Sequence, residues 1–334
     1  MPFVDRVRAT VPRRRVHLDS AALVVAAMKR SNLVDLDVAS IAERLEILTR
    51  SLDREADLTT RGRVEARHDL VELLVGRAEL LDTITRRPQL TTTPFDPPIV
   101  LTGLPAAGVD LLTDLLTTDP GIRVPAPVDL GTLDLASWDF EVRWNVPAYA
   151  EWFDRADLTD SYRLARAQLG RRQHDDPSGT WLLASPQHLE RTDELAAVFP
   201  GAVVVRLHRD PVVAVAELAR DVTRRRRSST TTVHPVTIGR YWSWRFERMA
   251  DRAEAAGTPH ELTILDLHHG DLVRDPIGTV DRVLAAAGRL RTTRTAFEVA
   301  EPALADPADY GIDRDDLRRR TARYSSRYDV RPEG

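Results

Sequence analysis

The sequence contains no cysteine, and it has a single lysine, Lys29, among its 47 lysine and arginine residues. The absence of cysteine excludes disulfides, thiolate metal sites and a cysteine nucleophile, and it leaves the redox compartment unread. Lys29 lies in the N-terminal region, far in sequence from every segment suited to binding a phosphate. A mechanism that needs a catalytic lysine therefore has one candidate, and that candidate is badly placed.

Long apolar runs are also missing. The longest ones, such as residues 21–28, fall far short of the roughly 20 residues that cross a bilayer. The N-terminal residues include arginines but lack the apolar stretch of a signal peptide. We therefore expect a cytoplasmic protein that does not enter the membrane.

A strong excess of positive charge is absent too. The net charge is -4, and the arginine run at residues 224–227 is a local cluster of the kind usually found in a solvated loop. We expect no nucleic-acid partner.

The first ninety or so residues have the apolar spacing of amphipathic helices. Apolar residues recur every three or four positions in residues 38–52 and again in residues 70–84. The pattern ends at Thr93-Pro94, and Asp96-Pro97-Pro98 follows. The sequence therefore predicts a helical N-terminal portion over residues 1–94 and a second region over residues 95–334.

The second region alternates short apolar runs with longer helical patterns, which favours an α/β fold with a mostly parallel sheet flanked by helices. The helical N-terminal portion should form a layer over one side. The run at 99–102 should be the central strand, and residues 224–232 should form a mobile loop. The predicted strands are residues 99–102, 180–184, 203–207 and 262–267, and the predicted helices between them include 111–117, 189–198 and 241–256.

The segment that follows the first strand has the layout of an anion-binding loop. A buried strand enters a turn containing Gly103, Pro105 and Gly108, and a helix follows. Such a turn directs backbone N–H groups and the start of a helix toward an anion. The segment lacks the Gly-Lys-Ser/Thr of nucleoside triphosphatases. Taken alone, the segment favours a plain strand-to-helix turn over an anion-binding loop.

Five blocks, in order along the chain, resemble the sulfotransferase family, especially its bacterial branch. The opening block begins Gly103-Leu104-Pro105, the second includes Ser185-Pro186 and His188, and the third ends His208-Arg209-Asp210-Pro211. A fourth block runs from Asp271 to Val280, and the tail has Tyr310-Gly311-Ile312, Tyr324 and Tyr328. The resemblance implies the P-loop-like sulfotransferase fold. An unrelated α/β nucleotide-binding protein is disfavoured by the order of the blocks.

The resemblance also implies a donor, 3'-phosphoadenosine 5'-phosphosulfate, and no metal. Gly103, Pro105 and Gly108 would lie on the 5'-phosphosulfate, and Arg209 would bind the 3'-phosphate. His188 would accept the proton of an acceptor hydroxyl. Arg209-Asp210-Pro211 also fits a helix start with Asp210 as its cap, and His188 also fits a histidine at a helix start or on the surface.

The sequence departs from the family at most of its phosphate-contacting side chains. The family has a basic residue at 106, hydroxyls at 107, 109 and 110, a lysine at 184 and a serine at 217. This chain has Ala106, Ala107, Val109, Asp110, Ala184 and Glu217. The basic and tyrosine positions before the tail, around residues 303–306, are unrecognisable. Donor binding is therefore in doubt.

Two functions follow from this comparison. In the first, the chain transfers a sulfuryl group from the donor to the hydroxyl of a small molecule, with weakened activity. In the second, it is a pseudoenzyme, or a repurposed binding or partner protein on the same fold. The sequence does not identify an acceptor, and a homo-oligomer or a protein partner stays open.

Overall fold

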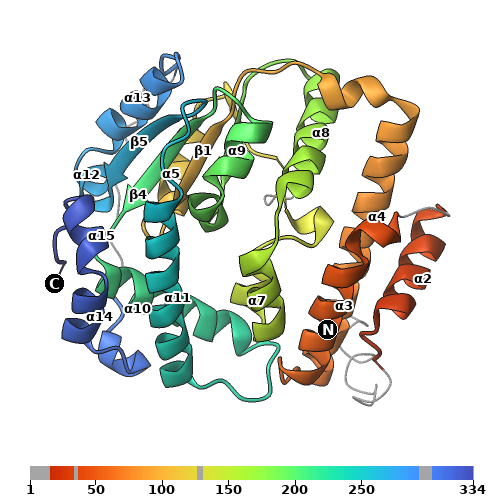
Figure 1. Cartoon of the computed structure of the whole chain (residues 1–334), viewed down its shortest axis with the longest axis horizontal. Coiled ribbons are helices and arrows are strands. Elements are labelled where there is room, and N and C mark those ends of the chain that lie inside the picture. Colours follow the sequence, from red (N-terminus) through yellow and green to blue (C-terminus); the bar gives the residue numbers. More distant parts are fainter. Residues whose placement is uncertain (1–15, 34–36, 126–130, 293–302, 334) are drawn as a thin grey trace, which may run out of the picture. The chain divides into compact units, whose positions relative to one another are not determined.

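The computed structural model describes residues 16–33, 37–125, 131–292 and 303–333 (Figure 1). The chain divides into two compact units. Unit 1 comprises Met1–Thr92, Leu130–Gln168 and Val222–Val233, and unit 2 comprises Thr93–Asp129, Leu169–Asp221 and His234–Gly334. The first boundary follows the short 3-10 helix η2 (Pro88–Thr92).

Unit 1 is helical, as its apolar spacing predicts. Helix α3 buries Ile41, Leu45, Leu48 and Leu52, which form one stripe along it. Thr59 caps helix α4 by accepting a hydrogen bond from the backbone N–H of Gly62 at 3.0 Å. The helices are α2 (Ser20–Ser31), α3 (Val38–Arg54), α4 (Thr60–Arg86), η3 (Thr132–Asp134), α6 (Asp139–Arg143), α7 (Pro147–Arg155) and α8 (Thr159–Asp175), of which α8 continues into unit 2.

Unit 2 is built on a five-stranded sheet in which every pairing is parallel, in the order β2-β3-β1-β4-β5. Strand β1 is central, as predicted, because its five residues are all buried and suit a strand covered on both faces. The two-residue edge strand β2 was not predicted from the sequence. The strands are β1 (Ile99–Gly103), β2 (Ile122–Arg123), β3 (Thr180–Ala184), β4 (Val203–His208) and β5 (Thr263–His268).

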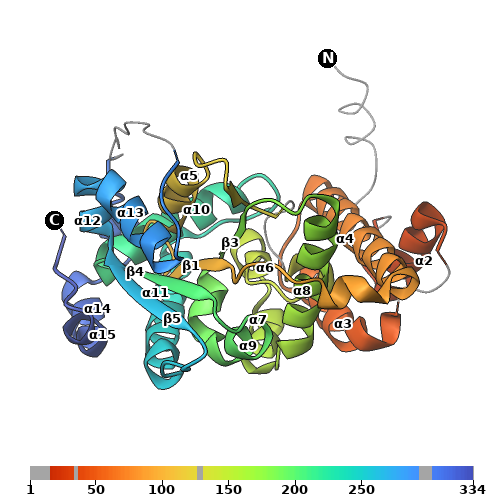
Figure 2. The same ribbon diagram turned by 90° about the horizontal axis from the view of Figure 1, so that it is seen from above.

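Helices cover both faces of this sheet (Figure 2). Alternate residues of β1 and β4, including Leu101 and Val205, pack with Leu112 and Val283 into one core under α5, α12 and α13. Helices α9, α11 and α15 lie on the other face. The helices of unit 2 are α5 (Val109–Leu116), η4 (Pro186–Glu190), α9 (Thr192–Val198), α10 (Pro211–Arg226), α11 (Pro235–Ala255), α12 (His269–Arg274), α13 (Pro276–Ala286), η5 (Pro307–Tyr310), α14 (Arg314–Arg320) and α15 (Ala322–Arg327), of which α10 continues into unit 1.

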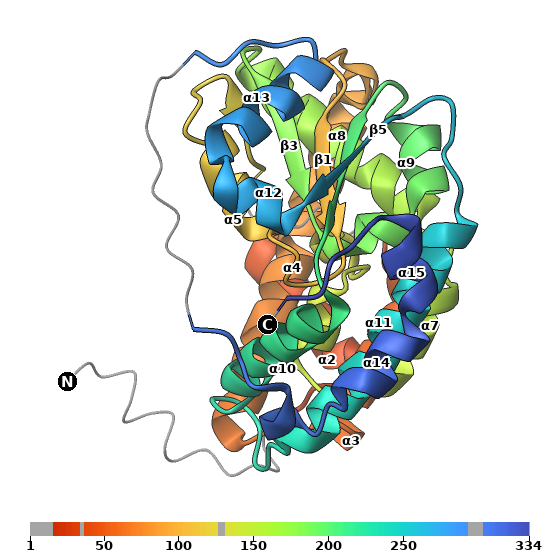
Figure 3. The same cartoon turned by 90° about the vertical axis from the view of Figure 1, so that its left-hand side faces the viewer.

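Helices α14 and α15 run alongside α11 (Figure 3). Close backbone approach fixes α11 at its start, because a Cβ on Gly239 would lie 2.1 Å from the carbonyl oxygen of Tyr310. The C-terminal helices are therefore part of the body of unit 2.

The prediction of a mobile loop around the arginine run is wrong for the first part of that run. The predicted loop at residues 224–232 is helical as far as Arg226, and the Arg226 side chain is buried. Its guanidinium donates hydrogen bonds to the carbonyl oxygens of Glu141 at 2.6 Å and Trp144 at 2.9 Å. These bonds satisfy the buried charge, so this arginine is part of the interior of unit 1.

Of the helices that the structure describes, none combines the length and the apolar character needed to cross a bilayer.

Candidate functional site

The parallel sheet brings the first three sequence blocks to one edge. Leu101 pairs with Ala184 of β3, and Gly103 pairs with Leu207 of β4. The backbone N–H of Ser185 continues this ladder by donating to the carbonyl oxygen of Leu101 at 3.1 Å. The segments that leave β1, β3 and β4 therefore start side by side at the carboxyl edge, where open α/β sheets bind ligands.

The β1–α5 turn keeps the backbone of an anion-binding loop. A Cβ on Gly103 would lie 2.4 Å from the carbonyl oxygen of Leu207, so only glycine fits between β1 and β4. Pro105 is buried, and the N–H of Ala107 closes the turn on the carbonyl oxygen of Leu104 at 3.1 Å. Gly108 has φ 104° and is the N-cap residue directly before α5. The three predicted backbone residues therefore lie in one turn before a helix.

The side chains of this turn do not form an anion site. Ala107 is fully buried, and Val109 is 8% exposed in the core beneath the sheet. Ala106 is exposed with φ 61°, a left-handed conformation that disfavours larger side chains. Asp110 is exposed in the first turn of α5, where its negative charge complements the helix dipole. These side chains donate no hydrogen bond, so the turn can contact an anion only through its backbone N–H groups.

The second block places His188 inside the protein. The hydroxyl of Thr102 donates to the carbonyl oxygen of Ser185 at 2.9 Å, which holds η4 against β1. His188 in η4 is 2% exposed, and burial lowers its pKa to about 3. An imidazole with so low a pKa accepts a proton poorly at neutral pH. The role of His188 as a proton acceptor stays a prediction.

The third block places Arg209 directly after β4, beside the β1–α5 turn. Its Nη1 donates to the carbonyl oxygen of Ala106 at 3.3 Å, and its Nε donates to the carboxylate of Glu333 at 3.1 Å. The Arg209 side chain is only 10% exposed. The predicted phosphate-binding arginine is therefore at the predicted edge and is bonded to the chain's own acceptors.

The two acidic residues that follow Arg209 also hold the chain's own segments. Asp210 caps α10 through the N–H of Val212 at 2.9 Å, and it accepts from Arg318 at 3.0 Å and from the N–H of Glu333 at 2.7 Å. Glu217 accepts from the N–H of Ala305 at 2.6 Å and pairs with Arg220. Position 217 thus anchors the segment around residues 303–306.

A polar network joins β4, β5 and α15 near this edge. Asp266 accepts two hydrogen bonds from Arg206, at 2.7 and 2.8 Å, and lies 2.9 Å from His208 Nε2. His208 Nδ1 lies 2.8 Å from the hydroxyl of Tyr324, and the His208 ring stacks on Tyr328. Burial alone would raise the pKa of Asp266, but its bonds to His208 and Arg206 hold that pKa well below its usual range. The network fastens α15 to the sheet beside Arg209.

Sequence reasoning missed this network, although a signal for it exists. Arg206 and His208 alternate with apolar residues in β4, and Asp266 does the same in β5, which puts all three on one face. Glu333 follows the last helix and has no comparable pattern.

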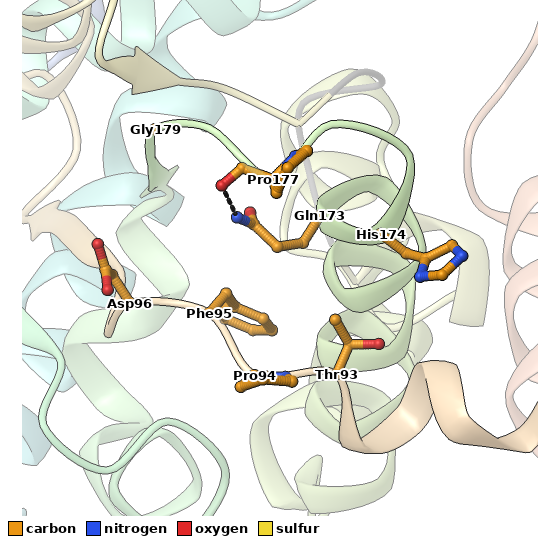
Figure 4. A pocket seen from close by; sticks show the side chains of 8 residues that line it. All are labelled: Thr93, Pro94, Phe95, Asp96, Gln173, His174, Pro177 and Gly179. Atoms are coloured by element: carbon orange, nitrogen blue, oxygen red, sulfur yellow. Dashed lines mark hydrogen bonds between the residues drawn. The ribbon is translucent and has the colours of Figure 1, made fainter.

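A separate pocket lies at the opposite edge of the sheet (Figure 4). It has a volume of about 550 Å³ and is lined by residues before β1 and before β3, among them Phe95, Gln173 and Gly179. The Gln173 side chain donates to the carbonyl oxygen of Pro177 at 2.7 Å. Because it lies at the amino ends of the strands, this pocket is not part of the carboxyl-edge site.

Among the residues that the structure describes, no cluster of histidine and carboxylate side chains could hold a metal ion.

Comparison with known proteins supports the assignment of the fold. The model of the sulfotransferase family matches residues 97–291, more than half of the chain. Sulfotransferase STF9 from Mycobacterium avium is similar at 20% identity with a TM-score of 0.83, over 95% of this chain and 98% of that one. Sulfotransferase STF1 from Mycobacterium tuberculosis H37Rv is similar at 24% identity with a TM-score of 0.76, over 90% of this chain and 98% of that one. None of the curated proteins matches the sequence.

Proposed function

Because the chain belongs to the sulfotransferase family, we propose that it keeps the family's scaffold but binds the sulfuryl donor weakly or not at all. Its own sulfuryl transfer would then be weak or lost, and it would act as a binding or partner protein on this fold. One observation carries the proposal. Arg209, the cation that remains at the predicted donor site, is bonded to Glu333 and to the carbonyl oxygen of Ala106.

The residues at the carboxyl edge fit a nucleotide bisphosphate poorly. Positions 106, 107, 109 and 184 have alanine or valine side chains, which donate no hydrogen bond. Two carboxylates, Asp110 and Glu217, stand where the family places hydroxyls that contact phosphate.

The size of the expected loss follows from the bonds that are missing. Each charge-assisted hydrogen bond to phosphate contributes about 1.5–3 kcal/mol, and several are absent together. Repulsion from a carboxylate adds to this loss. A combined loss of roughly 5 kcal/mol weakens binding by about three to four orders of magnitude. A donor that binds in the micromolar range would then bind only above about 1 mM.

A second candidate function is sulfuryl transfer to a small-molecule hydroxyl at a reduced rate. The backbone of the β1–α5 turn favours it, because Gly103 and Gly108 keep the turn before α5. The first N–H groups of a helix have no partner within that helix and suit an anion. In this alternative the backbone and Arg209 would hold the donor without the side chains of the turn.

A thermal-shift titration of the wild-type protein with 3'-phosphoadenosine 5'-phosphate separates the two. A ligand that binds the folded state raises the melting temperature in proportion to the logarithm of its concentration over its Kd. We expect no shift below about 1 mM, given the weakening estimated above. A clear shift at micromolar nucleotide, absent with adenosine as the control, would favour the transferase and overturn our proposal.

A further inference from the structure

We infer that Glu333 is a tethered anion that occupies the Arg209 guanidinium, so that an external anion binds there only by displacing it. The inference rests on the proposed function, because it explains how the remaining cation of the site is held closed. It concerns the regulation of that site by the segment that follows α15, residues 328–333.

The geometry of this segment supports a specific contact. After α15 the chain turns at Val330, whose N–H donates to the carbonyl oxygen of Ser325 at 2.9 Å. It then runs to the start of α10 (Figure 3). There Glu333 is attached twice, through its carboxylate to Arg209 at 3.1 Å and through its N–H to Asp210 at 2.7 Å.

The surroundings make this attachment more than a surface ion pair. The Asp210 side chain is 2% exposed, and that of Arg209 is 10% exposed. Charge-assisted bonds at such partly buried groups are stronger than bonds between solvated side chains. Arg318 donates to the same Asp210 oxygen that accepts from Glu333, so α14 helps to position the contact.

The carboxylate of Glu333 competes chemically with other oxyanions. A phosphate oxygen accepts from a guanidinium in the same way as a carboxylate oxygen does. A tethered group has an effective concentration in the millimolar range when its linker lets it reach the site. An external anion must therefore displace Glu333 before it binds Arg209. This competition lowers the apparent affinity of Arg209 for the external anion.

The test uses inorganic pyrophosphate as the probe. Its binding to the whole chain is measured by NMR titration at constant ionic strength. The variants are Glu333→Gln and, as a matched control, Asp281→Asn. Asp281 accepts from Arg291 Nε at 2.9 Å, a pair of the same geometry outside the carboxyl edge. We expect Glu333→Gln to bind pyrophosphate about 10-fold more tightly than wild type, a change of about 1.4 kcal/mol, and Asp281→Asn to match wild type.

Two further measurements bear on the same contact. Arg209→Gln should abolish the gain when it is combined with Glu333→Gln. Pyrophosphate should also speed hydrogen exchange of the Glu333 amide in wild type, because displacement of the carboxylate loosens the bond to Asp210. Equal affinity in wild type and Glu333→Gln, or no binding by either, would overturn the inference.

Failure of this inference and failure of the proposed function can be told apart. Micromolar binding of 3'-phosphoadenosine 5'-phosphate by wild type would overturn the proposed function, and the ratio of pyrophosphate affinities would still decide the role of Glu333.

Discussion

The β1–α5 turn and the β4–α10 junction meet at the same sheet edge but differ in what they keep. The turn keeps its backbone, with Gly103 and Gly108 in place, while its side chains are apolar or acidic. The junction keeps Arg209 and Asp210 and has Glu217 where the family places a serine, and each of these three side chains bonds to another part of the chain. The side chains of the turn named above donate no hydrogen bond, whereas the polar groups of the junction are occupied by other parts of the chain.

The difference shows two routes by which an anion site can close. Loss of side chains is visible in the sequence, because Ala106 and Ala184 cannot donate wherever they lie. Occupation is visible only in the structure, because Glu333 reaches Arg209 from a segment 124 positions later. The two routes predict different responses to substitution.

The largest effect should come from the backbone of the turn. Gly103→Ala would place a methyl group 2.4 Å from the carbonyl oxygen of Leu207, and since this is backbone it cannot swing aside. We expect a loss of about 3 kcal/mol in the free energy of unfolding, measured by urea denaturation. Gly270→Ala is the control, because nothing lies within 4 Å of its new Cβ in α12. Equal stability of the two variants would mean that β1 and β4 can separate at this edge, so the turn is not fixed.

A somewhat smaller effect should come from His188 in the second block, in the pH dependence of the free energy of unfolding. Burial lowers its pKa to about 3 in the folded protein, so the unfolded chain binds the extra proton first. Stability should therefore fall as the pH drops below the ordinary histidine pKa. Between about pH 7.5 and pH 5, wild type should lose about 2 kcal/mol more than His188→Gln. Parallel pH profiles of the two proteins would show that His188 takes up a proton while folded.

The smallest effect should come from the junction. Glu217→Gln keeps an acceptor for the N–H of Ala305 but removes the charge that Arg220 neutralises. We expect a loss of about 1 kcal/mol in the free energy of unfolding, together with faster hydrogen exchange of the Ala305 amide. Asp271→Asn removes an exposed pair with Arg274 and should cost less than about 0.5 kcal/mol. If the Ala305 amide exchanges equally in wild type and Glu217→Gln, the segment at 303–306 is held by other contacts.

Local patterns predicted the sheet because its strands are short runs rich in apolar residues. The predicted ends of β1, β3, β4 and β5 lie within one residue of the observed ones, since apolar stretches bounded by Gly and Pro leave little freedom. Strand β2 escaped because two residues give no periodicity. Helix α11 begins six residues before the predicted start, since Pro235 at its first turn is a helix start that apolar spacing does not reveal.

The contacts of the site were less predictable because they join distant parts of the chain. The blocks placed Gly103, His188 and Arg209 at one edge, since parallel strands end together. Local spacing does not encode the contact of Arg209 with Glu333 or the burial of Arg226. It also does not encode the bonds by which Asp266 joins Arg206 to His208. All of these depend on tertiary packing.

One calorimetric titration tests our proposal that this scaffold lacks the side chains that bind the donor. It compares 3'-phosphoadenosine 5'-phosphate binding by wild type with binding by a variant that combines Ala106→Arg, Ala107→Ser, Val109→Thr, Asp110→Thr and Ala184→Lys. Glu217 stays unchanged, because it anchors Ala305.

We expect no binding by wild type below about 1 mM, and at least about 30-fold tighter binding by the folded variant, equivalent to about 2 kcal/mol. The gains share one ligand and will not sum. Micromolar binding by wild type would show that its donor site is intact, and a folded variant that binds no better than wild type would show that the missing side chains are not the cause; either result would overturn the proposed function.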